Sequence, residues 1–120
     1  MKRFNLKSFR YAYDGLTTMI RTEPNSRVHL LAAFFAIILG FVLQIKALEW
    51  LFITLSIGIV FITELINSSI ERIANRIEPK PDPKIKEIKD LAAASVLVSA
   101  LASLVIGGII FIPKLIGLFR

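Results

Sequence analysis

Three long apolar runs restrict what this chain can fold into. They lie in residues 28–45, 48–77 and 91–112, the second ending in a polar segment. A helix needs roughly 17–25 predominantly apolar residues to cross a hydrocarbon core of about 30 Å. Within a bilayer, a run of this kind satisfies its backbone hydrogen bonds as a helix. We therefore predict an all-α membrane protein with three transmembrane helices.

Composition narrows the class of protein further. Hydrophobic residues make up 55% of the 120 residues, too many for an ordinary soluble domain. The length predicts a single membrane domain over residues 1–120. The absence of cysteine excludes disulfides and thiolate metal sites, and one histidine leaves little room for zinc. The net charge of +6 suits nucleic acid or anionic lipid, and the apolar content favours lipid and a membrane over nucleic acid.

Residues 1–22 mix charged and apolar side chains and predict an amphipathic helix lying in the membrane interface. The alternative is a solvated basic tail, which the interleaved aromatic residues disfavour. No unbroken apolar core or small-residue cleavage site is present in residues 1–21, so we expect no cleavable signal. One face holds Phe4, Phe9, Tyr13, Leu16 and Ile20, and Lys2, Arg3, Lys7, Arg10 and Asp14 lie elsewhere.

A break follows at Glu23 and Pro24. Proline disfavours helix at the residue before it and can begin a new helix, so Glu23 is predicted to sit at an elbow. Its carboxylate has two readings: it offsets a helix dipole, or it binds a cation at the membrane surface. Local sequence favours the first. We interpret His29, near one end of the first run, as an interfacial residue rather than a ligand.

The second run ends in a polar stripe. We use this name for Glu64, Asn67, Ser68, Glu71 and Asn75, which fall on one face of a helix over residues 48–77. Glu64, Asn67 and Glu71 lie within about 60° of one another around the helix axis. The helix is longer than a hydrocarbon core, so Glu64 is expected just inside the apolar boundary and Glu71 just outside. Carboxylates at such a boundary indicate a functional site.

A polar segment with three prolines, residues 78–90, separates the second run from the third. We expect an extended loop through Pro79, Pro81 and Pro83, a helix beginning within residues 85–90, and an end at Pro113. Small residues recur every four positions in the third run and favour close helix packing or an oligomer. They are Ser95, Ser99, Ser103 and Gly107.

Lysine and arginine counts predict the orientation. Six lie in residues 1–27, one at Lys46, six in residues 72–89 and two in the tail. The positive-inside rule then predicts a cytosolic N-terminus, an external C-terminus, and Glu23, the polar stripe and Lys89-Asp90 at one cytosolic interface.

Carboxylates, an amide and cations at one interface are the minimum parts for phosphoryl transfer to a membrane alcohol. A glutamate can act as general base on a hydroxyl, and glutamates nearer water suit Mg²⁺ and substrate phosphates. Lys89 could neutralise phosphate charge. The rival is an ion or proton path, although transporters place ionisable groups near the midplane. No nucleotide-binding glycine loop and no HExxH motif occurs.

Two segments resemble the bacterial diacylglycerol kinase and undecaprenol kinase family. They read Glu-Leu-Ile-Asn-Ser-Ser-Ile-Glu from Glu64 and Lys-Asp-Leu-Ala-Ala-Ala-Ser-Val from Lys89. The family signature is E-x-x-N-[ST]-[AS]-I-E, a short loop, and a K-D pair opening the last span. Glu23 matches the family's other acidic position, and the likeness covers nearly the whole chain.

The resemblance implies a small homotrimeric kinase of the bacterial inner membrane that uses MgATP and a lipid alcohol. It implies Glu64 as general base, positioned by Asn67, and Glu23 and Glu71 as Mg²⁺ ligands. Lys89 and Asp90 would contact the nucleotide phosphates. Tyr11 is a weaker match to a nucleotide-contacting aromatic residue, and the loop at residues 80–82 aligns with a segment near the nucleotide.

Two departures bear on the expected function. Many members have aspartate where this chain has Asn75, which puts a charge-dependent role there in doubt. The stretch after Asp90 is Leu-Ala-Ala-Ala, where diacylglycerol kinases often have Gly-Ser. The alanine-rich form is similar to undecaprenol kinases, so undecaprenol is the expected acceptor and diacylglycerol the alternative.

Overall fold

The computed structural model describes residues 6–120, and these residues form four helices and contain no strand. The helices are α1 (Leu6–Thr22), α2 (Pro24–Val42), α3 (Ala47–Ile77) and α4 (Pro83–Leu118). By length and composition α2, α3 and α4 are apolar enough to cross a membrane, which confirms the prediction of three spans. Of the expected interfacial helix, residues 1–5 lie outside the described part.

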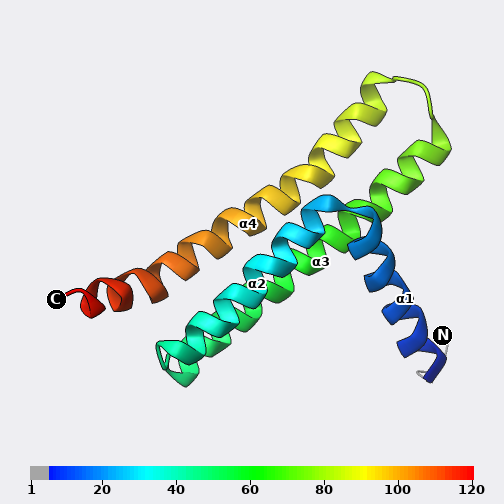
Figure 1. Ribbon diagram of the computed structural model, residues 1–120. Helices are drawn as coiled ribbons and strands as arrows, with labels where there is room; N and C mark the ends of the chain where they lie inside the picture. Colours follow the sequence, from blue (N-terminus) through cyan, green and yellow to red (C-terminus); the bar gives the residue numbers. More distant parts are fainter. Residues whose placement is uncertain (1–5) are drawn as a thin grey trace.

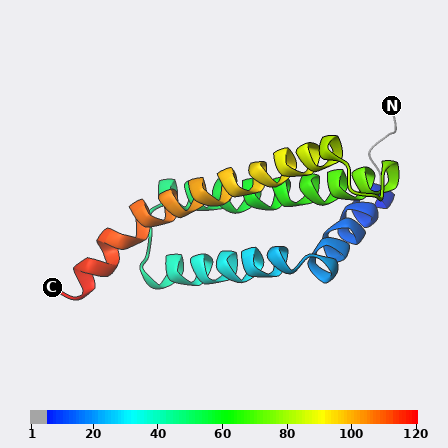
Figure 2. The ribbon, with the colours of Figure 1, turned by 90° about the horizontal axis from the view of Figure 1, so that it is seen from above.

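The three long helices run up and down beside one another (Figure 1). The pair α3 and α4 packs antiparallel and makes the most extensive contact between helices, and α2 runs beside α3. Figure 2 shows α3 and α4 close together, with α2 in a separate row. Helix α1 projects from the start of α2 and touches both α2 and α3. Residues of α1, α2 and α3 therefore meet at this junction.

The elbow between α1 and α2 is held by side chains of α2. Glu23 is extended, with φ −112° and ψ 107°, and Pro24 is the first residue of α2. The Ser26 hydroxyl is fully buried and lies 3.0 Å from the Met19 carbonyl oxygen and 2.7 Å from that of Glu23. Arg27 donates to two further carbonyls at the end of α1. These bonds satisfy carbonyls that a helix end leaves free, and they fix the elbow.

Helix α2 starts and ends earlier than its apolar run predicts. The run covers 28–45, whereas α2 covers Pro24–Val42. Gln44 has φ 52°, and the amides of Gln44 and Ile45 donate to the carbonyls of Phe41 and Gly40. This pattern is a Schellman motif, in which a left-handed residue ends the helix and an apolar residue packs behind it. Ile45 is buried in that position, so hydrophobicity continues past the helix end.

Helix α4 is longer at both ends than expected, which corrects the prediction for Pro83 and Pro113. Pro83 is its first residue, where the missing N–H costs no hydrogen bond. Asp82 caps this end, because its carboxylate accepts from the amides of Lys84 and Ile85 at 2.8 and 3.4 Å. At the other end the helix continues through Pro113 to Leu118. Ile110 and Phe111, one turn before the proline, are buried against α3 and hold the chain there.

The main apolar cluster lies at the end of the molecule away from the elbow. There a Cβ on Gly40 would come within 2.6 Å of the Trp50 ring, so glycine permits this close approach. Nearby, the Lys114 ammonium lies 3.2 Å from the Glu49 carboxylate. The cluster comprises Ile45, Ile53, Ile110 and Phe111.

Candidate active site

The polar stripe passes from the interior of the protein to its surface. Glu64 and Ser68 are buried, with 3% and 7% of their surface exposed. Asn67 and Glu71 are half-buried, and Asn75 is exposed. Because residues three and four apart lie above one another on a helix, the five side chains form one continuous track. The track leads from an enclosed carboxylate outward along α3.

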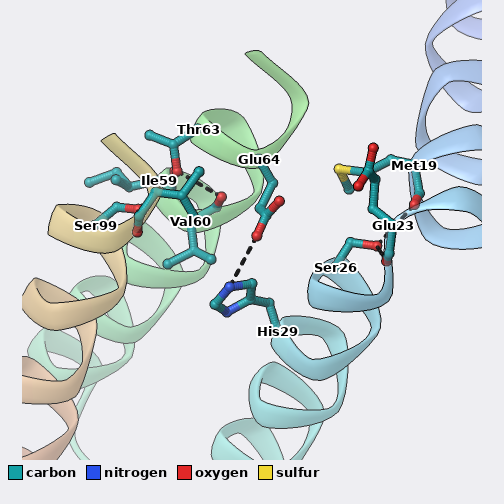
Figure 3. A network of polar contacts seen from close by, with 10 residues as sticks. Met19, Glu23, Ser26, His29, Ile59, Val60, Thr63, Glu64 and Ser99 are labelled. Atoms are coloured by element: carbon teal, nitrogen blue, oxygen red, sulfur yellow. Dashed lines mark hydrogen bonds and ion pairs between the residues drawn. The ribbon is translucent and has the colours of Figure 1, made fainter. Parts of the chain in front are cut away.

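The side chain of Glu64 points toward α2, where it meets His29 (Figure 3). His29 Nε2 lies 3.1 Å from Glu64 Oε1, but within the described chain this oxygen has no partner in hydrogen-bond geometry. The charges of Glu23 and Glu71 also act on Glu64. Sequence reasoning missed this contact of His29. The signal that could have found it is an acid inside an apolar run, which requires a polar partner from another helix.

Asn67, one turn from Glu64, also has an unsatisfied acceptor. Its Oδ1 is buried and has no hydrogen-bond partner among the described residues. Buried acceptors are nearly always paired, so this oxygen beside the Glu64 carboxylate indicates a missing donor. A hydroxyl group brought to this place could supply it.

The elbow brings Glu23 to the polar stripe. The Ser68 hydroxyl donates to Glu23 Oε1 at 3.1 Å, and Arg72 donates to the Thr22 hydroxyl at 2.8 Å. Glu71 lies on the same face as Ser68, three residues further along. No hydrogen bond or ion pair engages the Glu71 carboxylate within residues 6–120. Glu23 therefore approaches the part of α3 that carries Glu71, the other predicted metal ligand.

These carboxylates form no complete metal cage by themselves. Among the described residues, no group of three or more histidine, aspartate or glutamate side chains could hold a metal ion together. Magnesium, however, is commonly held by one or two carboxylates together with substrate phosphates and water. The donor set of Glu23 and Glu71 fits that mode of binding.

Lys89 reaches the outer end of the polar stripe. Its ammonium donates to Asn75 Oδ1, which joins the start of α4 to the end of α3. Asp90 takes a different direction, because its carboxylate pairs with Lys86 on the same helix at 2.6 Å. Lys89 therefore contacts the polar stripe, whereas Asp90 pairs within α4.

A hollow of about 740 Å³ lies beneath the proline-containing loop between α3 and α4. It opens beside the outer end of the polar stripe, and both Lys89 and Asp90 line it. Three lysines against three acids give it a mixed charge. The lining consists of Glu78, Pro79, Lys80, Pro81, Asp82, Pro83, Ile85, Lys86, Lys89 and Asp90.

Tyr11 lies apart from these groups. It is 67% exposed on α1, roughly 18 Å along the helix from Glu23. Within one chain, the structure does not bring it to the polar stripe.

Comparison with known proteins gives a consistent family. Residues 10–111 match the family described as prokaryotic diacylglycerol kinase. The undecaprenol kinase of Bacillus subtilis (strain 168) is 42% identical over 115 residues, which are 96% of this chain and 93% of that protein. The diacylglycerol kinase of Synechocystis is 31% identical over 94% of this chain and 65% of its own length. That of Escherichia coli (strain K12) is 25% identical over 83% of this chain and 82% of its own length.

Proposed function

This chain belongs to the prokaryotic diacylglycerol kinase family of membrane lipid kinases, and we propose that it phosphorylates undecaprenol with MgATP. The γ-phosphoryl group of ATP passes to the lipid hydroxyl, with diacylglycerol as the alternative acceptor. The 42% identity to an undecaprenol kinase over almost the whole of both chains supports this preference. The alanine-rich start of the last span, residues 91–94, supports it too.

The observation that carries the proposal is an unpaired buried acceptor, Asn67 Oδ1, beside the buried Glu64 carboxylate on α3. Asn67 Oδ1 has no hydrogen-bond partner within the described chain, and it lies one turn from the Glu64 carboxylate on a helix that is apolar enough to cross a membrane. A lipid alcohol can offer its O–H there. The Glu64 carboxylate accepts the hydroxyl proton as the oxygen attacks phosphorus, and Asn67 orients the reacting groups.

Glu71 and Glu23 would hold Mg²⁺, which supplies charge neutralisation for the nucleotide phosphates when bound. Glu71 is unengaged within residues 6–120, and Ser68 holds one oxygen of Glu23 toward α3. Because these carboxylates lie outward of Glu64, they can meet a nucleotide that approaches from water while the lipid approaches from the bilayer.

Lys89 would lie against the nucleotide phosphates at the outer end of the polar stripe. Asn75 accepts its hydrogen bond without carrying a charge, so this partner does not offset the positive charge of the ammonium. The hollow beneath the loop has room for part of a nucleotide, with Asp90 on its wall. Tyr11 could contribute to the nucleotide site only from a position that one chain does not provide.

The exposed surface of the single chain indicates that lipid or further copies of the chain surround it. Large apolar side chains cover the outer faces of all three long helices, among them Phe34, Phe35, Leu55 and Leu104. In water such a surface would associate, and in a membrane it is covered by lipid or further copies. We propose a homotrimer in the bacterial inner membrane, with α1 in the interface, a cytosolic N-terminus and an external C-terminus. The family match supports a lipid kinase and gives no support to an ion-conducting subunit.

The direct test is transfer of labelled phosphate. Purified protein with Mg²⁺ and γ-labelled ATP should phosphorylate undecaprenol with a higher kcat/KM than diacylglycerol. We expect a preference of about tenfold or more, which corresponds to about 1.4 kcal/mol of transition-state binding. Failure to label any prenol or diacylglycerol contradicts the kinase function. Equal or reversed rates contradict only the acceptor preference.

Replacing Glu71 by glutamine should weaken Mg²⁺-dependent nucleotide binding. The amide keeps the size of the side chain but loses the negative charge that a hard cation prefers. We expect the Kd of MgATP to rise by about tenfold or more, as a loss of at least about 1.4 kcal/mol. Titration with ATP at several Mg²⁺ concentrations measures this. The matched variant Glu87→Gln, on α4 away from the stripe, should bind normally. Equal Kd values for Glu71→Gln and the native protein would remove Glu71 as a ligand.

A further inference from the structure

The buried Glu64 carboxylate has a close polar neighbour on another helix. That neighbour is His29, whose Nε2 lies 3.1 Å from Glu64 Oε1. Glu64 is 3% exposed, whereas the His29 side chain is 23% exposed. An ionised carboxylate removed from water is costly unless another group donates to it or balances its charge. The imidazole can donate Nε2–H whether the ring is neutral or cationic.

The position of His29 is set by the same elbow that places Glu23. Glu23 and His29 lie six residues apart, and they contact Ser68 and Glu64, which lie four residues apart on α3. These two contacts tie the beginning of α2 to the polar stripe, and Figure 3 shows the one between His29 and Glu64. Ser26 lies between Glu23 and His29 in the sequence, and its buried hydroxyl fixes the first turn of α2 against α1. The distance between the predicted metal ligand and the predicted base is therefore controlled by one rigid segment.

We infer that His29 is a positioning residue for the Glu64 carboxylate. Its Nε2–H engages Oε1 and leaves the second carboxylate oxygen to accept the proton of the lipid hydroxyl. The inference rests on the proposed role of Glu64 as general base. The present contact lacks hydrogen-bond geometry, and such contacts in enzymes tighten when substrate is bound. His29 touches neither substrate, so it acts only through Glu64.

Replacing His29 by alanine should lower kcat for lipid phosphorylation by about 100-fold, the effect of a small misplacement of a catalytic group. The KM for ATP should change little, because the nucleotide groups lie further outward. Added imidazole should restore much of the rate. His29→Gln, which keeps an N–H donor, should retain more activity than His29→Ala. The matched control Leu30→Ala removes an adjacent partly exposed side chain and should keep its rate without a response to imidazole.

Unchanged kcat in His29→Ala overturns the inference. A loss of kcat that added imidazole does not relieve, and that is equally large in His29→Gln, also overturns the inference. That result would assign His29 a merely structural role. Either result leaves the kinase function standing, since the native protein still labels the lipid. If the native protein labels no lipid, the proposed function fails instead.

A second measurement is independent of turnover. The sequence contains one histidine, so ¹⁵N labelling of histidine gives an unambiguous signal for His29 in the full chain. Glu64→Gln should shift the Nε2 resonance, while the control Glu49→Gln, at the other end of α3, should not. An unshifted resonance in Glu64→Gln shows that the contact is absent and overturns the inference.

Discussion

Replacing Glu64 by glutamine should lower kcat for lipid phosphorylation by about 10²–10⁴-fold, the usual contribution of a general base. The amide keeps the shape of the side chain but cannot accept the hydroxyl proton. Nucleotide binding should be largely retained, because Glu23, Glu71 and Lys89 are unchanged. Steady-state kinetics with saturating lipid, together with a nucleotide-binding titration, separates these two effects.

Glu49→Gln is the matched control for this prediction. Glu49 is also a glutamate of α3, but it lies at the opposite end and pairs with Lys114 at 3.2 Å. Its replacement should leave kcat within about twofold, because Glu49 lies in the first turn of α3, far from the reacting groups. A rate near that of the native protein in Glu64→Gln would remove Glu64 as the base, whatever the control shows.

Replacing Lys89 by methionine should lower kcat/KM for ATP by about 10²–10³-fold, as expected when one donor to a developing phosphate charge is removed. Methionine preserves much of the apolar stem and removes the ammonium. The loss should appear in kcat as well as in KM, because the phosphate charge redistributes in the transition state. Kinetics at varied ATP and fixed saturating lipid measure both constants.

Lys86→Met provides the comparison. Lys86 lines the same hollow one turn earlier, but its charge is already compensated by Asp90 at 2.6 Å. We expect at most a few-fold effect from its removal. Equal losses in the two variants would mean that the hollow attracts nucleotide only through overall charge, and would contradict a specific role for Lys89.

Helical periodicity was sufficient to predict the polar stripe. Glu64, Asn67 and Glu71 share a face in any helix of this register, since their spacing is a local property of the backbone. Along the stripe the side chains change from buried at Glu64 to exposed at Asn75. The elbow at Pro24 was predictable for the same reason, because proline acts on its immediate neighbours.

The partners of the stripe were not predictable in this way. The His29–Glu64 contact depends on how α2 packs against α3, and the Lys89–Asn75 bond depends on how α4 returns beside α3. His29 appeared interfacial from its position in the run alone. Asn75, where the family resemblance leads one to expect aspartate, accepts a hydrogen bond from Lys89.

Among the helix ends, too, some could be predicted from local sequence and others depended on packing between helices. Pro83 and Pro113 were expected outside the last helix, yet α4 begins at the first and continues through the second. The Asp82 cap could have been read from sequence, because it needs only the next three residues. The continuation past Pro113 could not, because it accompanies burial of Ile110 and Phe111 against residues of α3.

The sequence by itself determined three apolar helices, an elbow before the first of them, and the polar stripe at one end of the second. These features follow from length, hydrophobicity and the backbone repeat, which act over a few residues. Only the tertiary structure decided that His29 meets Glu64, that Ser68 holds Glu23, and that Lys89 rather than Asp90 turns to the stripe. Those contacts join residues 14 to 45 positions apart, so they depend on packing between helices.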